Sequence, residues 1–193
     1  MSVGWFHFEA GLRGGSRRCI EDVPSIMDVW IGENYERSAD RILILGESWY
    51  GDVEPLAAYV PRWARAEITR DYTFARIFNA ASGFHTDHAT LVQRLAWWNG
   101  IAFYNFVPGT VGASADDRPS SAALAAARMP LTAVLAHLAP KGVWIIGKGQ
   151  AKYSADVVLH FGAQYEVTDH PGARPTSAAM AASWANLRQR LRM

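Results

Sequence analysis

Four short apolar runs, separated by longer stretches of helical character, are the feature of this sequence that most constrains its fold. The runs are RILIL at 41–45, IAFYNFV at 101–107, VWII at 143–146 and QYEVT at 164–168. Each is bounded by Gly, Pro, Asn or Asp, which is typical of strands. Strands that alternate with helices predict an α/β fold, here a three-layer α/β/α sandwich around a central four-stranded parallel sheet.

The helical stretches fall at 73–82, 89–98, 120–138 and 176–192. Pro130 should kink the third of them, and Thr176 or Ser177 should cap the last. The length of 193 residues predicts a single domain over 1–193. We expect residues 1–40 to form an N-terminal extension packed on it, with a Gly-rich surface loop and a short helix leading into the first strand.

Composition excludes several classes of protein. Half of the residues are hydrophobic, which indicates a globular chain, and the formal net charge of +1 argues neither for nor against a nucleic-acid partner. Cys19 is the single cysteine, so an intramolecular disulfide and a cysteine-ligated metal cluster are both excluded. We expect a cytoplasmic protein, because no apolar run approaches the length of a membrane span and no signal-peptide core is present.

Chemically distinctive residues follow the predicted strands. GESWYGD follows the first, Asn105 lies within the second, GKGQAKY follows the third and DHPGAR follows the fourth. Ligands of open parallel sheets bind beyond the carboxyl ends of the strands. The sequence therefore predicts a site where these four segments converge.

These segments resemble motifs of the uracil-DNA glycosylase superfamily. That superfamily has a motif G-x-[D/N/A]-P-[Y/G] after its first strand, an Asn on a later strand, and H-P-S-x near its end. Here the corresponding residues are 46–50 (GESWY), Asn105 and 170–174 (HPGAR). The segments VWIIGKGQAKY and FARIFNAASGF are similar to the mismatch-specific branch, and the chain as a whole is closest to the mismatch-specific and single-strand-selective branches.

The resemblance implies hydrolysis of the N-glycosidic bond of uracil, or of another deaminated base, in DNA during base excision repair. The reaction that the resemblance implies requires neither a metal nor an organic cofactor. A flipped base would lie against Gly46 and Tyr50, with Tyr50 excluding thymine. Asn105 would read the base edge, since an amide offers a donor and an acceptor. A neutral His170 would stabilise the departing base.

The water-positioning residue departs from the family pattern. Ser48 stands where the most efficient branch has Asp, and its hydroxyl supplies no negative charge. Glu47 and Asp52 are the carboxylates that could replace it. Trp49 stands in place of the usual Pro, and Gly172 in place of the usual Ser.

Further contacts with base and DNA are also implied. Four aromatic residues could stack on the base, namely Tyr59, Trp63, Tyr72 and Phe74, and we favour Tyr72. Arg174 would insert into the gap left by the flipped base, beside Pro171 and Gly172. Lys148 would contact a DNA phosphate, unless it is simply solvated.

Alternatives remain for the residues and for the function. His170 and Asn105 could be structural, and His85, Asp87 and His88 could ligate a metal, although Asp87 fits better as a helix N-cap. The protein could be a uracil- or nucleic-acid-binding module without efficient catalysis, or an enzyme of free nucleosides or nucleotides. The oligomeric state is left open.

Overall fold

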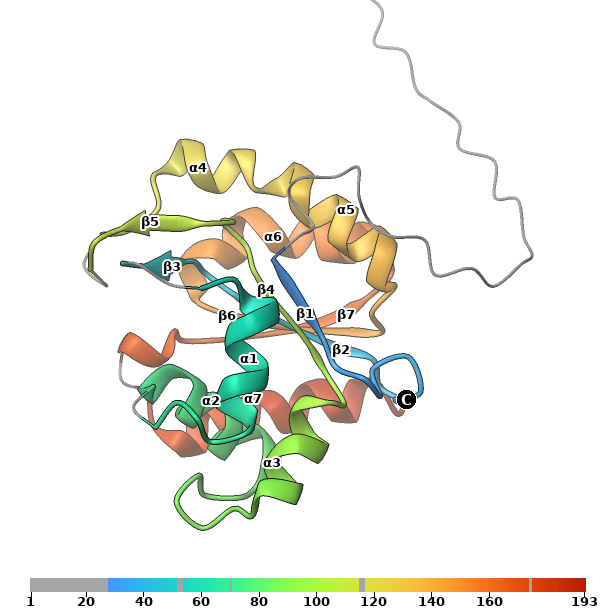
Figure 1. Ribbon diagram of the computed structural model, residues 1–193. Helices are drawn as coiled ribbons and strands as arrows, with labels where there is room; N and C mark the ends of the chain where they lie inside the picture. The colour runs from blue at the N-terminus through green and yellow to red at the C-terminus, as the bar shows by residue number, and fades with distance from the viewer. Residues whose placement is uncertain (1–27, 52–53, 70, 115–116, 174) are drawn as a thin grey trace, which may run out of the picture.

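The computed structural model describes residues 28–51, 54–69, 71–114, 117–173 and 175–193. A five-stranded sheet in the order β1-β4-β2-β6-β7 lies at its centre (Figure 1). The strands are β1 (Val29–Ile31), β2 (Ile42–Gly46), β4 (Ala102–Asn105), β6 (Gly142–Ile146) and β7 (Gln164–Thr168). β4, β2, β6 and β7 are mutually parallel, which confirms the strands expected from the four apolar runs.

The fifth strand corrects the expectation for the N-terminal region. β1 pairs antiparallel with β4, with Val29 opposite Tyr104 and Ile31 opposite Ala102. The short helix expected before the first strand is absent from the described part of 1–40, and the rest of that region lies outside the described residues. β-Branched and aromatic side chains favour the strand, and the free edge of β4 supplies its hydrogen-bond partners.

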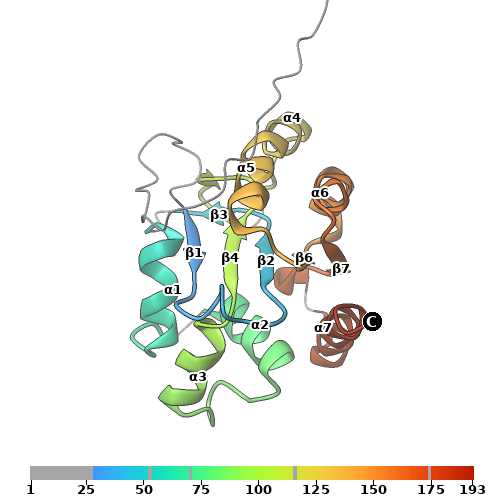
Figure 2. The same ribbon diagram turned by 90° about the vertical axis from the view of Figure 1, so that its right-hand side faces the viewer.

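Helices cover both faces of the sheet (Figures 1 and 2). One face carries α4 (Ser121–Ala126), α5 (Arg128–Leu138) and α6 (Lys148–His160). The other face carries α1 (Leu56–Ala64), α2 (Tyr72–Ser82), α3 (Leu91–Trp98) and α7 (Ser177–Arg190). α1 and α6 were not indicated by the sequence patterns above.

Each face of the sheet has its own hydrophobic core. Leu43 and Leu45 of β2 pack toward α5 and α6. Ile42 and Ile44 of the same strand belong to the other cluster, with the side chains of α1, α2, α3 and α7. Because successive strand residues point to opposite faces, an unbroken apolar strand such as β2 serves both cores and is buried throughout.

The third helical stretch is interrupted earlier than expected. α4 ends at Ala126 and α5 begins at Arg128, so Pro130 lies in the first turn of α5. Proline has no N–H to donate to the carbonyl four residues back, which is that of Ala126, and its ring would clash there. The last helix begins as expected, since the Thr176 hydroxyl accepts a hydrogen bond from Ala179 N at 3.1 Å.

One described segment also has the length and apolar composition of a membrane span, namely Ser121–Leu138. This is weak evidence, because core helices have the same properties. Here Leu131, Val134 and Leu135 pack on the sheet.

A second, two-stranded sheet lies beside the end of β2. β3 (Trp49–Tyr50) pairs parallel with β5 (Thr110–Gly112). β3 follows β2 after two residues, so this pairing fixes the path of the chain just beyond the carboxyl end of β2. β7 is followed by the short 3-10 helix η1 (Pro171–Ala173).

Candidate functional site

The strands of the sheet part at the carboxyl ends of β2 and β6. These two strands pair as far as Leu45 and Ile145. Beyond that point Gly46 pairs with Asn105 of β4, while Ile146 pairs with Thr168 of β7. Such a divergence between neighbouring parallel strands is the place where open α/β sheets bind ligands.

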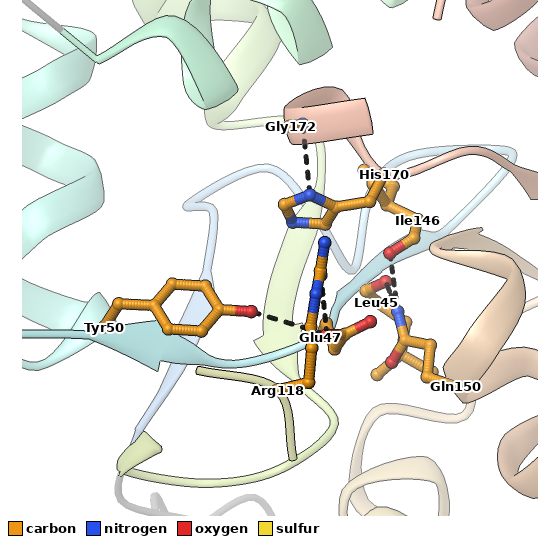
Figure 3. Close-up of polar contacts among 8 residues, drawn as sticks. All are labelled: Leu45, Glu47, Tyr50, Arg118, Ile146, Gln150, His170 and Gly172. Carbon is orange, nitrogen blue, oxygen red and sulfur yellow. Dashed lines mark hydrogen bonds and ion pairs between the residues drawn. The ribbon is translucent and has the colours of Figure 1, made fainter. Parts of the chain in front are cut away.

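Gln150 of α6 fills the gap between the parting strands. Its side chain is fully buried, and its Nε2 donates to Leu45 O at 3.0 Å and to Ile146 O at 2.7 Å (Figure 3). These carbonyls belong to different strands, so one amide group ties β2 to β6.

A cavity of about 80 Å³ lies at this point. Its lining combines polar groups from the strand ends with aromatic and aliphatic side chains of the core. The residues are Gly46, Glu47, Ser48, Trp49, Tyr50, Asp71, Thr73, Phe74, Ile77, Phe103, Asn105, Ile146 and His170. We call it the inner cavity.

A second cavity of about 370 Å³ shares Glu47 and His170 with the inner one. It is lined by Glu47, Arg118, Pro119, Leu124, Gly147, Lys148, Gly149, Asp169, His170 and Ala173. We call it the outer cleft. Glu47 and His170 therefore lie at the junction between the inner cavity and the more charged outer cleft.

Asn105 is 4% exposed and lines the inner cavity. No hydrogen bond joins its side-chain amide to another described residue. Its Oδ1 lies so close to Gly46 that a Cβ at Gly46 would collide with it. The amide is thus held against a glycine, with its hydrogen-bonding capacity available to a ligand.

The imidazole of His170 has a defined tautomer. Gly172 N donates to its Nδ1 at 3.1 Å (Figure 3). In the neutral ring the proton must then be on Nε2, which becomes a donor. Burial lowers the pKa of His170, an effect that the Glu47 carboxylate opposes and the Arg118 guanidinium reinforces. The ring is therefore uncharged at neutral pH.

The turn after His170 is anchored from α2. Pro171 is buried, and Arg76 Nη1 donates to Pro171 O at 2.6 Å. A Cβ at Gly172 would lie 3.1 Å from His170 Nδ1, so glycine permits the close approach of the backbone to the ring. Arg76 was not recognised in the sequence, because an arginine on a helix has no distinguishing local pattern.

Glu47 is a buried carboxylate whose two oxygens have different surroundings. Its Oε1 accepts from Arg118 Nη1 at 3.2 Å and from the Tyr50 hydroxyl at 3.4 Å (Figure 3). Its Oε2 has no hydrogen bond to the described residues and lies beside the first turn of α6, 3.4 Å from where a Cβ on Gly147 would be. The carboxylate therefore keeps one oxygen free for a water or a cationic group.

Ser48 is also buried, and its Oγ has no hydrogen-bond partner among the described residues. A buried hydroxyl left in this state costs about 1–3 kcal/mol. A bound water or ligand in the inner cavity would supply the missing partner.

The expected stacking residue lies elsewhere. Tyr72 is 82% exposed at the start of α2 and does not line the inner cavity. Phe74, two residues later, does line it and stacks on Trp49 with ring centroids 5.9 Å apart. The helix begins at Tyr72 itself, so the buried face starts with Phe74.

Asp71, absent from the sequence expectations, also lines the inner cavity. Its carboxylate accepts from the Tyr59 hydroxyl at 2.6 Å and from Phe74 N at 3.0 Å, which makes it the N-cap of α2. Burial and this hydrogen bond raise the pKa of Tyr59, so its hydroxyl stays protonated. A capping-type pattern is the one signal that could have identified Asp71.

Of the expected DNA contacts Lys148 and Arg174, only Lys148 lies among the described residues. Lys148 lines the outer cleft, is largely exposed, and forms an ion pair with Asp169 at 3.0 Å. Arg174 and Asp52 lie outside the described residues.

In the described part of the chain, no group of three or more His, Cys, Asp or Glu is arranged to hold a metal. Thr90, and not Asp87, caps α3.

These features define an α/β protein whose parallel strands end at a small cavity lined by an amide, a neutral imidazole, a carboxylate and aromatic rings. No known protein-family model matches the chain. No curated protein matches its sequence either.

Proposed function

We propose that this protein is a DNA glycosylase that hydrolyses the N-glycosidic bond of uracil, or of another deaminated base, in DNA. One observation carries the proposal: Asn105 and His170, which are far apart in the sequence, line the same inner cavity. A carboxamide that reads a base and a neutral imidazole that stabilises a leaving group are the two functions that this chemistry needs.

The motif resemblance supports the same proposal. GESWY follows β2, Asn105 ends β4, and His170 and Pro171 follow β7. These are the elements on which the uracil-DNA glycosylase motifs would lie. We therefore also propose that the sandwich is of the uracil-DNA glycosylase type, and that the protein acts in base excision repair in the cytoplasm.

The size of the inner cavity bears on the choice of base. About 80 Å³ is far below the roughly 300–1,000 Å³ of pockets for drug-sized ligands. The cavity suits one flipped base, and the sugar and phosphates would occupy the outer cleft. Uracil is favoured over a larger purine such as hypoxanthine. Phe74 and Phe103 would contact the base, and Tyr50 would oppose a thymine methyl group.

The proposed reaction consumes one water. The bond between the sugar C1′ and the base nitrogen breaks, and its electron pair passes to the base, whose O2 gains negative charge. The Nε2–H of His170 donates to that oxygen. Water adds to the sugar cation at C1′, and its proton is ultimately taken up by the released base. The products are the free base and an abasic site.

Glu47 is the better candidate to position that water. Its Oε2 is free, and its negative charge would offset the sugar cation, which the hydroxyl of Ser48 cannot do. Ser48 Oγ would then hydrogen-bond to the water or the base. The proposed reaction involves neither metal nor organic cofactor, because the carboxylate and the imidazole supply the charge and the donor.

The test is single-turnover cleavage of oligonucleotides that carry uracil, hypoxanthine, xanthine or mismatched thymine, in single and double strands. We expect uracil to be released. His170→Ala should slow release by about 100- to 1,000-fold, the usual effect of removing one such donor. Asn105→Ala should weaken base recognition.

Matched controls are His137→Ala on α5 and Asn186→Ala on α7, since both side chains are exposed. Neither should alter the rate. Oligonucleotide binding without an abasic product would favour a binding module instead. Cleavage of free deoxyuridine with no oligonucleotide cleavage would favour an enzyme of free nucleosides.

A further inference from the structure

Arg118 reaches the site from outside the motif segments. It lies in the loop between β5 and α4, and its side chain is 55% exposed, whereas that of Glu47 is 9% exposed. Its Nη1 nevertheless lies 3.2 Å from Glu47 Oε1. An exposed arginine whose guanidinium bonds to a buried carboxylate contacts the site from its rim.

The position of this loop is fixed by the small sheet. Gly51 N donates to Gly112 O at 2.7 Å, and Tyr50 pairs with Gly112. Asp117, next to Arg118, packs against Gly112 and accepts from Ser114 N at 2.9 Å. Tyr50 and Arg118, the two partners of Glu47 Oε1, are thus both held by the β3–β5 pair.

Arg118 also faces His170 from the rim (Figure 3). The guanidinium lies near both Glu47 and the imidazole. Asp169, the neighbour of His170, is already paired with Lys148. On the α2 side, Arg76 bonds to Pro171 O, and the Asp71 carboxylate is engaged by Tyr59. Glu47 and Arg118 are therefore the charges that act most directly on the ring.

We infer that Arg118 is a positioning residue of this site: it holds Glu47 by one oxygen, leaves the other free for water, and places a positive charge beside His170. The part that concerns water rests on the proposed function. Arg118 thus binds the Glu47 carboxylate and not a DNA phosphate, although Arg118 lies in the outer cleft where phosphates would pass. The two assignments make different predictions.

The experiment compares Arg118→Gln and Arg118→Lys with the unaltered protein. Arg128→Gln is the matched control, because Arg128 also pairs with a carboxylate, that of Asp156 at 2.7 Å, but outside the site. NMR titration of the His170 ring and the Glu47 carboxyl group is the first measurement. Single-turnover cleavage and the dissociation constant for a uracil-containing strand, each at several salt concentrations, are the others.

We expect Arg118→Gln to raise the pKa of His170, because a positive charge that disfavours the imidazolium is removed. Arg118→Lys should restore much of the difference, and Arg128→Gln should leave the titration unchanged. Misplacing a catalytic group by about 1 Å can cost about 100-fold in rate. Cleavage by Arg118→Gln should therefore fall by about that factor, while strand affinity changes less than about twofold.

An unchanged His170 titration in Arg118→Gln would overturn the inference, whether or not the protein cleaves DNA. So would a loss confined to strand affinity with a shallower salt dependence, which is the signature of a phosphate contact. If no oligonucleotide is cleaved but the His170 titration shifts as expected, the placement of Arg118 stands and the proposed hydrolysis fails. Thermal unfolding of each variant checks that it is folded.

Discussion

Two glycines make room for the side chains on which the site depends. Gly46 lies against the Asn105 amide, and Gly172 lies against the His170 ring. Neither is required by an unusual backbone angle, since both lack the positive φ seen at Gly51 or Gly83. They matter because an added methyl group at Gly46 would occupy space that the Asn105 amide now holds, and one at Gly172 would press on the His170 ring.

Gly46→Ala should therefore impair base recognition more than stability. The new methyl group must displace the Asn105 amide, which is free to move toward the cavity that the base would fill. We expect uracil release to slow by about 100-fold, as for other small misplacements. Gly100→Ala is the control, because its added Cβ would meet nothing closer than 3.4 Å. Equal rates for both variants would contradict this account.

His170 should make stability depend on pH. Burial lowers its folded pKa below the ordinary 6.5, so the unfolded chain binds the proton first as pH falls. The free energy of unfolding should be highest above pH 6.5, decrease as pH falls from there through the folded pKa, and then level off. Urea denaturation of the protein and of the His170→Gln variant at several pH values measures this free energy. The variant should lose the part of the pH dependence that arises from His170.

Protonation of His170 should also disturb the site itself. An imidazolium carries a proton on Nδ1, which would then face the Gly172 N–H instead of accepting from it. Activity should fall on the acid side as the turn rearranges.

Among the structural elements, the parting of β2 and β6 is what creates the site, and α6 stabilises the opening. The Gln150 amide replaces the hydrogen bonds that the diverging strands no longer give each other. A helix that begins directly after β6 places this residue at the gap.

Gln150→Leu should lower the free energy of unfolding by about 2–6 kcal/mol, since two buried carbonyls lose their donor at about 1–3 kcal/mol each. The measurement is urea denaturation. Gln189→Leu is the control, because Gln189 is exposed on α7. Amide hydrogen exchange should also become faster at the ends of β2 and β6. A change below about 0.5 kcal/mol would show that water replaces the amide without loss.

The sequence predicted the elements that carry a long apolar signal. The runs that became β2, β4, β6 and β7 are four or more apolar or alternating residues with clear boundaries, and Glu47, Asn105 and His170 at their ends line one cavity. β1, β3 and β5 have only two or three residues each, too few for a pattern. The contact of Arg118 with Glu47 depends on the β3–β5 pairing, which only the folded chain establishes, so no local signal marked Arg118 as a partner of Glu47.

At the scale of the whole molecule, charge is balanced. The formal net charge is +1, and the two cations of the outer cleft, Arg118 and Lys148, are each paired with a carboxylate. The outer cleft is therefore not uniformly basic, because its two cations alternate with the carboxylates of Glu47 and Asp169.

Strand binding should therefore depend only weakly on salt. Each neutralised phosphate of a single strand contributes about 0.7 to the slope of log affinity against log salt concentration. We expect a slope of magnitude below about 2, measured by fluorescence anisotropy between about 50 and 300 mM KCl. A slope above about 4 would mean that several unpaired cations contact the backbone. Lys148→Gln should change the slope by less than one.

The pairing of β3 with β5 has a consequence for protein engineering. Main-chain hydrogen bonds between β3 and β5 fix the backbone path beside the inner cavity. Side chains on β3 can therefore be exchanged without changing that path. A saturation library at Tyr50, which lines the inner cavity, would then sample new cavity shapes on an unaltered main chain, a practical starting point for changing which ligands fit.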